Sequence, residues 1–248
     1  RTAVKGLKFN IGFNKRCKNA DLILCKTQST LNSIPKQFKN KVQIFTDVAV
    51  EHLDSTKYKS ATKTTSKYIN FYAVGRLDAW RGFDLLIEAF AKATKSQSNI
   101  KLEILGKGSD KIRLETLIEK LEMESFITLG GQVSMEKYYQ KLANCDVVVN
   151  PCLKEGAVTI AFDSMSFAKP LICINTGGYT RYFNNDYSVV IPKTTREAVI
   201  ENLTEAILEM TDVNKRKDKG QKARKTGEQF DWNHKGKAIY ELIISSHK

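Results

Sequence analysis

The feature that most constrains how this chain can fold is a regular alternation of short apolar runs with amphipathic segments, which begins at Tyr68. The apolar runs are nearly continuous, as is typical of strands buried on both faces of a sheet. Predicted strands cover residues 68–74, 101–105, 126–129, 146–150, 171–174 and 188–191, and predicted helices cover residues 82–94, 109–121, 135–143, 158–167, 180–183 and 195–210. The alternation predicts an α/β fold with a Rossmann-like, doubly wound parallel sheet.

Sheets of this kind bind ligands outside the carboxyl ends of their strands, so the residues that follow each predicted strand are candidate site residues. In chain order they are Gly75, Arg76 and Arg81, then Gly106, Lys107 and Gly108, then residues 130–133 ending at Val133, then Glu155 and Gly156, and finally residues 175–178. Glycine lets a backbone approach a ligand closely, and two arginines in one loop can neutralise a diphosphate. Their recurrence at one edge predicts a binding site there.

The stretch from Glu155 to Asp163 places two carboxylates around a predicted strand-to-helix junction. Because a helix rises about 1.5 Å per residue, eight positions separate them by roughly 12 Å, about the reach from a sugar ring to the ribose of a nucleotide. The free N–H groups of Ala157, Val158 and Thr159 would point from the helix start toward a diphosphate. The alternative is that the acidic residues only complement the helix dipole.

The net charge of +13 is unevenly distributed along the 248 residues. Residues 1–68 contain 14 Lys and Arg against 4 Asp and Glu, whereas residues 69–213 contain 16 against 19. The remaining excess lies mainly in residues 214–225. Because the regular part is slightly acidic, a nucleic-acid groove is not expected, and the basic flanks fit either an anionic membrane or ordinary solvated helix surface.

The sequence contains no apolar run long enough to span a bilayer, and we expect no signal peptide. Its five cysteines form no C-x-x-C pair, and three of them lie in or beside predicted strands. We therefore expect reduced core cysteines in a cytoplasmic protein, with peripheral membrane contact as an option.

Before the alternation, residues 19–25, 27–38 and 41–45 predict a strand, a helix and a strand. A unit this short cannot close a hydrophobic core by itself. We therefore expect residues 1–50 to be the C-terminal remnant of a first lobe that is largely missing. Residues 51–68 are polar and without pattern, as expected of a linker. Residues 69–248 would form the main lobe.

Three segments together resemble the C-terminal, donor-binding lobe of a GT-B glycosyltransferase of glycosyltransferase family four. They lie in residues 75–90 (GRL, then RGFDLLIEAF), residues 104–108 (ILGKG) and residues 155–178 (EGAVTIAFDSMSFAKPLICINTGG). The resemblance covers residues 68–243, and residues 1–50 similarly look like the end of that family's N-terminal lobe. Phe230-Asp-Trp232 resembles the start of its closing helix.

The resemblance implies a role for each matching residue. Arg76 and Arg81 would neutralise the leaving diphosphate and Glu155 would bind donor-sugar hydroxyls as catalytic residues, while Gly75, Lys107, Val133, Gly156, Ala157, Val158, Thr159 and Asp163 would bind the donor. Arg81 stands where the family usually has Lys, which keeps the charge but changes its geometry. Asp163 stands where the family has the Glu that holds the ribose, and being one methylene shorter it is expected to need a water bridge or a small helix shift.

The implied activity is retaining transfer of a sugar from a nucleotide-sugar donor, UDP-linked or else GDP-linked, to a glycan or lipid-linked acceptor in polysaccharide or glycoconjugate biosynthesis. No metal or other cofactor is implied, because the arginines and the helix dipole would stabilise the departing diphosphate. The missing lobe would supply the acceptor pocket, so we expect this fragment to bind donor but to be inactive alone. No histidine is assigned a catalytic role. A non-catalytic interaction protein and a sugar-nucleotide epimerase remain alternatives.

Overall fold

The computed structural model describes residues 10–53, 55–58, 67–154, 156 and 158–246. Its centre is a six-stranded parallel sheet in the order β5-β4-β3-β6-β7-β8, which confirms the predicted doubly wound sheet. The strands are β3 (Ile69–Val74), β4 (Ile100–Leu105), β5 (Ile127–Gly131), β6 (Val147–Asn150), β7 (Leu171–Ile174) and β8 (Ser188–Ile191). The strand order reverses between β3 and β6, and a crevice for ligands is expected at this switch point.

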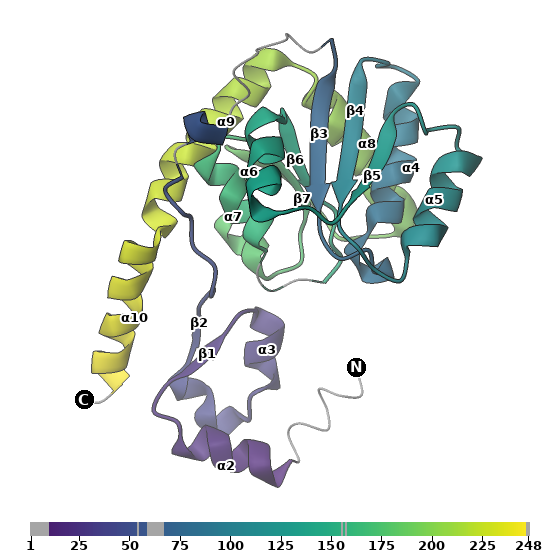
Figure 1. Ribbon diagram of the computed structural model, residues 1–248. Helices are drawn as coiled ribbons and strands as arrows, with labels where there is room; N and C mark the ends of the chain where they lie inside the picture. The colour runs from purple at the N-terminus through teal and green to yellow at the C-terminus, as the bar shows by residue number, and fades with distance from the viewer. Residues whose placement is uncertain (1–9, 54, 59–66, 155, 157, 247–248) are drawn as a thin grey trace.

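Helices cover both faces of the sheet (Figure 1). The α4 face carries α4 (Phe83–Thr94), α5 (Lys111–Lys120) and α8 (Arg196–Glu209), and the α7 face carries α6 (Met135–Asn144), α7 (Thr159–Ser166) and α9 (Val213–Gly227). Alternate residues of a strand point to opposite faces. Phe71 and Ala73 of β3 accordingly pack on the α4 face, while Tyr72 packs on the α7 face.

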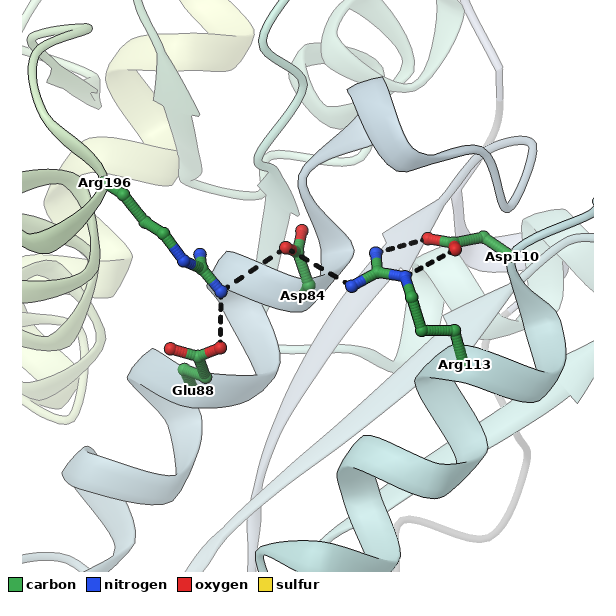
Figure 2. A network of polar contacts seen from close by, with 5 residues as sticks. All are labelled: Asp84, Glu88, Asp110, Arg113 and Arg196. Carbon is green, nitrogen blue, oxygen red and sulfur yellow. Dashed lines mark hydrogen bonds and ion pairs between the residues drawn. The ribbon is translucent and has the colours of Figure 1, made fainter.

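A network of five charged residues joins the helix starts at the rim of the α4 face (Figure 2). The guanidinium of Arg113 donates two hydrogen bonds of 2.6 Å to Asp110, directly before α5, and lies 3.7 Å from Asp84 of α4. Arg196 at the start of α8 pairs with Asp84 and Glu88. Each side chain of the network lies near one of opposite charge, so the pairs connect the starts of three helices, and their partial exposure limits what they contribute to stability.

The N-terminal segment forms a small two-stranded parallel sheet with α2 (Ile11–Asn19), β1 (Ile23–Cys25), α3 (Gln28–Ser33), the 3-10 helix η1 (Lys36–Lys41) and β2 (Val42–Ile44). The helix predicted over residues 27–38 is wrong beyond Ser33. Pro35 explains the break, since the residue before a proline avoids the helical region and Ile34 is extended at φ −67° and ψ 137°. The two predicted strands are shorter than expected, and α2 was not predicted.

The segment between the two sheets packs onto the α7 face. Val50 is buried there and forms a parallel bridge with Asp231. The 3-10 helix η2 (Ser55–Tyr58) places the ring of Tyr58 5.3 Å from that of Tyr139 on α6. Further 3-10 turns are η3 (Ala79–Arg81), η4 (Tyr179–Tyr182) and η5 (Glu228–Phe230). The last helix, α10 (Trp232–Ser246), extends away from the six-stranded sheet (Figure 1).

All five cysteines are buried and none forms a disulfide, which confirms them as core residues. Of the helices in the described residues, none combines the length and the apolar character that crossing a bilayer requires.

Candidate functional site

A cavity of about 440 Å³ opens at the carboxyl edge of the sheet, at the predicted switch point. Its walls come from the ends of β3, β4 and β5, from the last residue of η3, from the loop after β5, from the first turns of α6 and α7 and from the residue before α7. The lining residues are Val74, Arg81, Leu105, Gly106, Gly131, Gln132, Val133, Met135, Tyr138, Val158, Thr159 and Ile160. Aliphatic side chains and backbone dominate this wall, and only a few polar side chains reach it, as in pockets that bind small organic ligands.

The loop after β3 brings Arg81 to the cavity. Gly82 adopts the left-handed conformation at φ 70°, and a Cβ there would lie 2.3 Å from the carbonyl oxygen of Pro151. Only glycine therefore allows this loop to pack against the end of β6. The guanidinium of Arg81 lies 4.2 Å from the ring centre of Trp80, an arrangement that orients the cation.

The other predicted arginine is placed differently. Nε of Arg76 lies 3.1 Å from a carboxylate oxygen of Asp78, and the Arg76 side chain is 74% exposed. Arg76 does not line the cavity, so of the predicted pair only Arg81 reaches it.

The turn after β4 forms the floor of the cavity. Gly106 has φ 145°, and a Cβ there would lie 1.8 Å from the carbonyl oxygen of Gly75. This close approach requires glycine and brings the ends of β3 and β4 together. Lys107, the next residue, is exposed and does not line the cavity.

The start of α7 forms the opposite wall. Val158 precedes the helix in an extended conformation, and its side chain cannot accept a hydrogen bond, so no cap side chain occupies the first N–H groups. Thr159 and Ile160 of the first turn line the cavity. Unpaired N–H groups and the helix dipole attract anions at such a position. Gly156 does not line the cavity, and Glu155 and Ala157 lie outside the described residues.

Asp163 does not reach the cavity surface. Its side chain points from α7 toward α6, where one carboxylate oxygen accepts a 2.5 Å hydrogen bond from the Tyr138 hydroxyl, and the residue is only 3% exposed. Burial raises the pKa of Asp163 to about 6, against the lowering effect of the tyrosine bond. Burial and the neighbouring carboxylate also hold the pKa of Tyr138 far above its ordinary value.

Of the residues predicted for the site, Arg81, Val133, Val158 and Thr159 line the cavity, and Tyr138 lines it without having been predicted. Ser134 signals the start of α6, since its side chain accepts a hydrogen bond from the backbone of Lys137. A tyrosine four positions later would be expected on the same side of that helix. Within the described residues, no group of three His, Cys, Asp or Glu side chains is arranged to hold a metal ion.

Two relatives cover different shares of the chain. A glycosyltransferase of unassigned specificity from Methanocaldococcus jannaschii is 31% identical over 166 residues, which are 62% of this chain and 40% of the relative. The N-acetylgalactosamine-N,N'-diacetylbacillosaminyl-diphospho-undecaprenol 4-alpha-N-acetylgalactosaminyltransferase of Campylobacter jejuni is 25% identical over 217 residues, 86% of this chain and 57% of the relative. The chain thus spans about half the length of these proteins.

Solved structures share the fold. The structure of Anabaena HepE in complex with UDP superposes with a TM-score of 0.77 at 18% identity, over 98% of this chain and 68% of that one. The family model of glycosyl transferases group 1 matches residues 54–226, which include all of the cavity-lining residues. With a GT-B fold and this match over most of its length, the chain belongs to the glycosyl transferases group 1 family.

Proposed function

We propose that the cavity binds the diphosphate and nucleoside of a nucleotide sugar. A UDP-sugar is the favoured donor, and a GDP-sugar is the second candidate. With an acceptor-binding lobe, the enzyme would transfer the sugar with retention of configuration to a glycan or lipid-linked acceptor. One observation carries this proposal: the cationic side chain of Arg81 and the uncapped start of α7 meet at the same cavity. Both favour a multiply charged anion.

In this proposal the diphosphate lies between Arg81 and the backbone of Val158 and Thr159. Negative charge grows on the diphosphate as its bond to the sugar breaks, and fixed donors aimed at that charge stabilise the transition state. Arg76 could join after its exposed side chain rotates from Asp78. We assign Glu155 to the sugar hydroxyls and Gly156 and Ala157 to the phosphate by the resemblance. No metal is needed in this scheme, because the protein supplies the positive charge.

The nucleoside lies farther along the cavity, toward the loop after β5. Val133 and Gly131 offer apolar surface and backbone groups to a base, and Gly75 and Lys107 flank the floor nearby. The retaining course, the donor and the acceptor are all parts of the proposal.

A panel of nucleotide sugars in a thermal-shift assay tests the function. A ligand at 100 times its Kd adds about 2.7 kcal/mol of stability, which corresponds to a rise in Tm of several degrees for a protein of this size. We expect the rise with UDP-sugars, and its loss in Arg81→Ala. Arg224→Ala, which removes an exposed arginine from α9, should keep the rise. A Tm unaffected by every nucleotide sugar would contradict the proposal.

We further propose that the acceptor is lipid-linked and that basic segments hold the enzyme at an anionic membrane. The Campylobacter relative carries the name of an enzyme acting on a diphospho-undecaprenol substrate. Exposed basic residues are concentrated on α9 (Lys215, Lys217, Lys222, Arg224 and Lys225) and in the N-terminal segment (Lys15, Arg16, Lys18, Lys36 and Lys39). Each one close to a membrane surface contributes about 1 kcal/mol.

Liposome flotation tests the membrane contact. The protein should float with vesicles that contain anionic lipid, remain unbound with neutral vesicles, and detach as salt rises. Replacing the five basic residues of α9 by Gln, or those of the N-terminal segment, shows which segment binds. Equal recovery with both vesicle types, or no recovery with either, would leave these residues as solvated surface.

A further inference from the structure

The Tyr138–Asp163 pair joins the cavity wall to the layer of side chains behind it. Tyr138 lines the cavity from α6, while Asp163 lies behind it on α7, away from the lining. The two helices are neighbours on the α7 face (Figure 1). In the proposed binding mode the ribose must lie between the diphosphate at the start of α7 and the base near Val133. Tyr138 shares the cavity wall with Val133 and with the start of α7, so it is a candidate contact for this ribose.

The hydrogen bond fixes what Tyr138 can offer to a ligand. Its hydroxyl hydrogen is donated to the Asp163 carboxylate, so the hydroxyl oxygen keeps lone pairs with which it can accept. The Tyr138 residue is 8% exposed, so its rotation is limited by packing. A fixed acceptor of this kind suits a ligand hydroxyl, which can donate, better than a phosphate oxygen, which cannot.

We propose that Tyr138 contacts the ribose of the bound nucleotide by accepting a hydrogen bond from one of its hydroxyls, and that Asp163 is a positioning residue acting through Tyr138. This inference rests on the proposed function, since it assumes a nucleotide in the cavity. It assigns to a tyrosine the contact that the resemblance gives to the carboxylate.

Calorimetry with UDP, 2′-deoxy-UDP and 3′-deoxy-UDP tests the inference. We expect the wild-type protein to bind one deoxy analogue roughly threefold to tenfold more weakly than UDP, the effect of one neutral hydrogen bond. In Tyr138→Phe, UDP and that analogue should bind equally. Because both affinities are measured on the same sample, their ratio does not depend on how much of the variant is folded.

Tyr72→Phe is the matched control. It removes a hydroxyl from a neighbouring buried tyrosine, whose ring centre lies 6.3 Å from that of Tyr138, but which does not line the cavity. In this variant the ratio of the affinity for UDP to the affinity for the deoxy analogue should stay at its wild-type value. At position 163, Asp163→Asn keeps an acceptor for the tyrosine hydroxyl and should retain the preference for UDP over the deoxy analogue. Asp163→Leu removes that acceptor and should bind UDP and the analogue equally.

The outcomes separate the two proposals. Suppose that the wild-type protein binds UDP and that Tyr138→Phe keeps the wild-type ratio of UDP affinity to deoxy-UDP affinity. This result overturns the inference and leaves the proposed function standing. Equal binding of UDP and both deoxy analogues by the wild-type protein does the same. A wild-type protein that binds neither UDP nor GDP overturns both. Loss of the ratio in Tyr138→Phe together with its retention in Tyr72→Phe supports the inference.

Discussion

The charged residues lie in different places on the two faces of the six-stranded sheet. On the α4 face the charged residues lie at the rim, where Asp84, Glu88 and Asp110 pair with Arg113 and Arg196 (Figure 2), and the core beneath is apolar. On the α7 face the buried layer itself holds polar groups, including the carboxylate of Asp163 under the cavity. Burying a carboxylate costs free energy that pairing with a neutral hydroxyl only partly offsets. The comparison suggests that the α4 face stabilises the lobe, while the α7 face gives up some stability to shape the site.

The largest effect expected from this comparison is on the α4 face. Phe90 is completely buried on α4 and packs edge-to-face on Phe71, with ring centres 5.5 Å apart. Phe90→Ala should lower the free energy of unfolding by about 3–5 kcal/mol, measured by urea denaturation. The UDP affinity of the folded protein should not change. A large loss of affinity in a variant that remains folded would show that the α4 face also shapes the site.

A smaller effect of opposite sign is expected at Asp163 on the α7 face. Its pKa of about 6, raised mainly by burial and further by Glu51, lies above the value of an unfolded Asp. The stability that the protonated form contributes is complete below about pH 4 and is lost as pH rises through 6. At pH 7.5, Asp163→Asn should therefore raise the free energy of unfolding by about 1–3 kcal/mol.

The pH dependence isolates this effect from other carboxylates. The difference in unfolding free energy between Asp163→Asn and wild type should grow between pH 4 and pH 7 and then level off. A difference that is constant over this range would mean that Asp163 titrates normally, and the contrast between the two faces would lose its main support.

The smallest effect is expected in the network at the rim. Arg196 is 43% exposed on its side chain, so Arg196→Met should cost no more than about 1 kcal/mol, and less at high salt. Lys222→Met provides a control, since it breaks a single exposed pair with Asp218 and should cost less still. Urea denaturation at low and high salt measures both. A loss of stability in Arg196→Met larger than the gain in Asp163→Asn would reverse the comparison.

The fold was predictable from the sequence where one periodicity dominates a segment. The β3–α8 alternation shows apolar strands and helical stripes, and all six strands were located. The prediction of one helix over residues 27–38 was wrong because Pro35 prevents the helix from continuing. Helix α2 was not predicted because, of its residues, only Cys17 is buried.

Part of the cavity wall was predictable from the loops that follow the strands. Arg81, Val133 and Thr159 line the cavity, whereas Arg76 and Lys107, which lie no farther from their strand ends, do not. The Tyr138–Asp163 pair was not predictable, because its members lie 25 positions apart and meet only when α6 packs beside α7. The roles of Glu155 and Ala157 stay predictions.

Calorimetry of UDP binding in the presence of EDTA tests the central claim most directly. We expect the chain to bind UDP without metal, and Arg81→Ala to lose about 1.5–3 kcal/mol, the contribution of a charge-assisted hydrogen bond. Arg76→Ala should lose less, because its side chain is exposed and paired with Asp78. Binding that disappears with EDTA, or an affinity unchanged in both arginine variants, would contradict the claim that Arg81 and the start of α7 form a metal-independent diphosphate site.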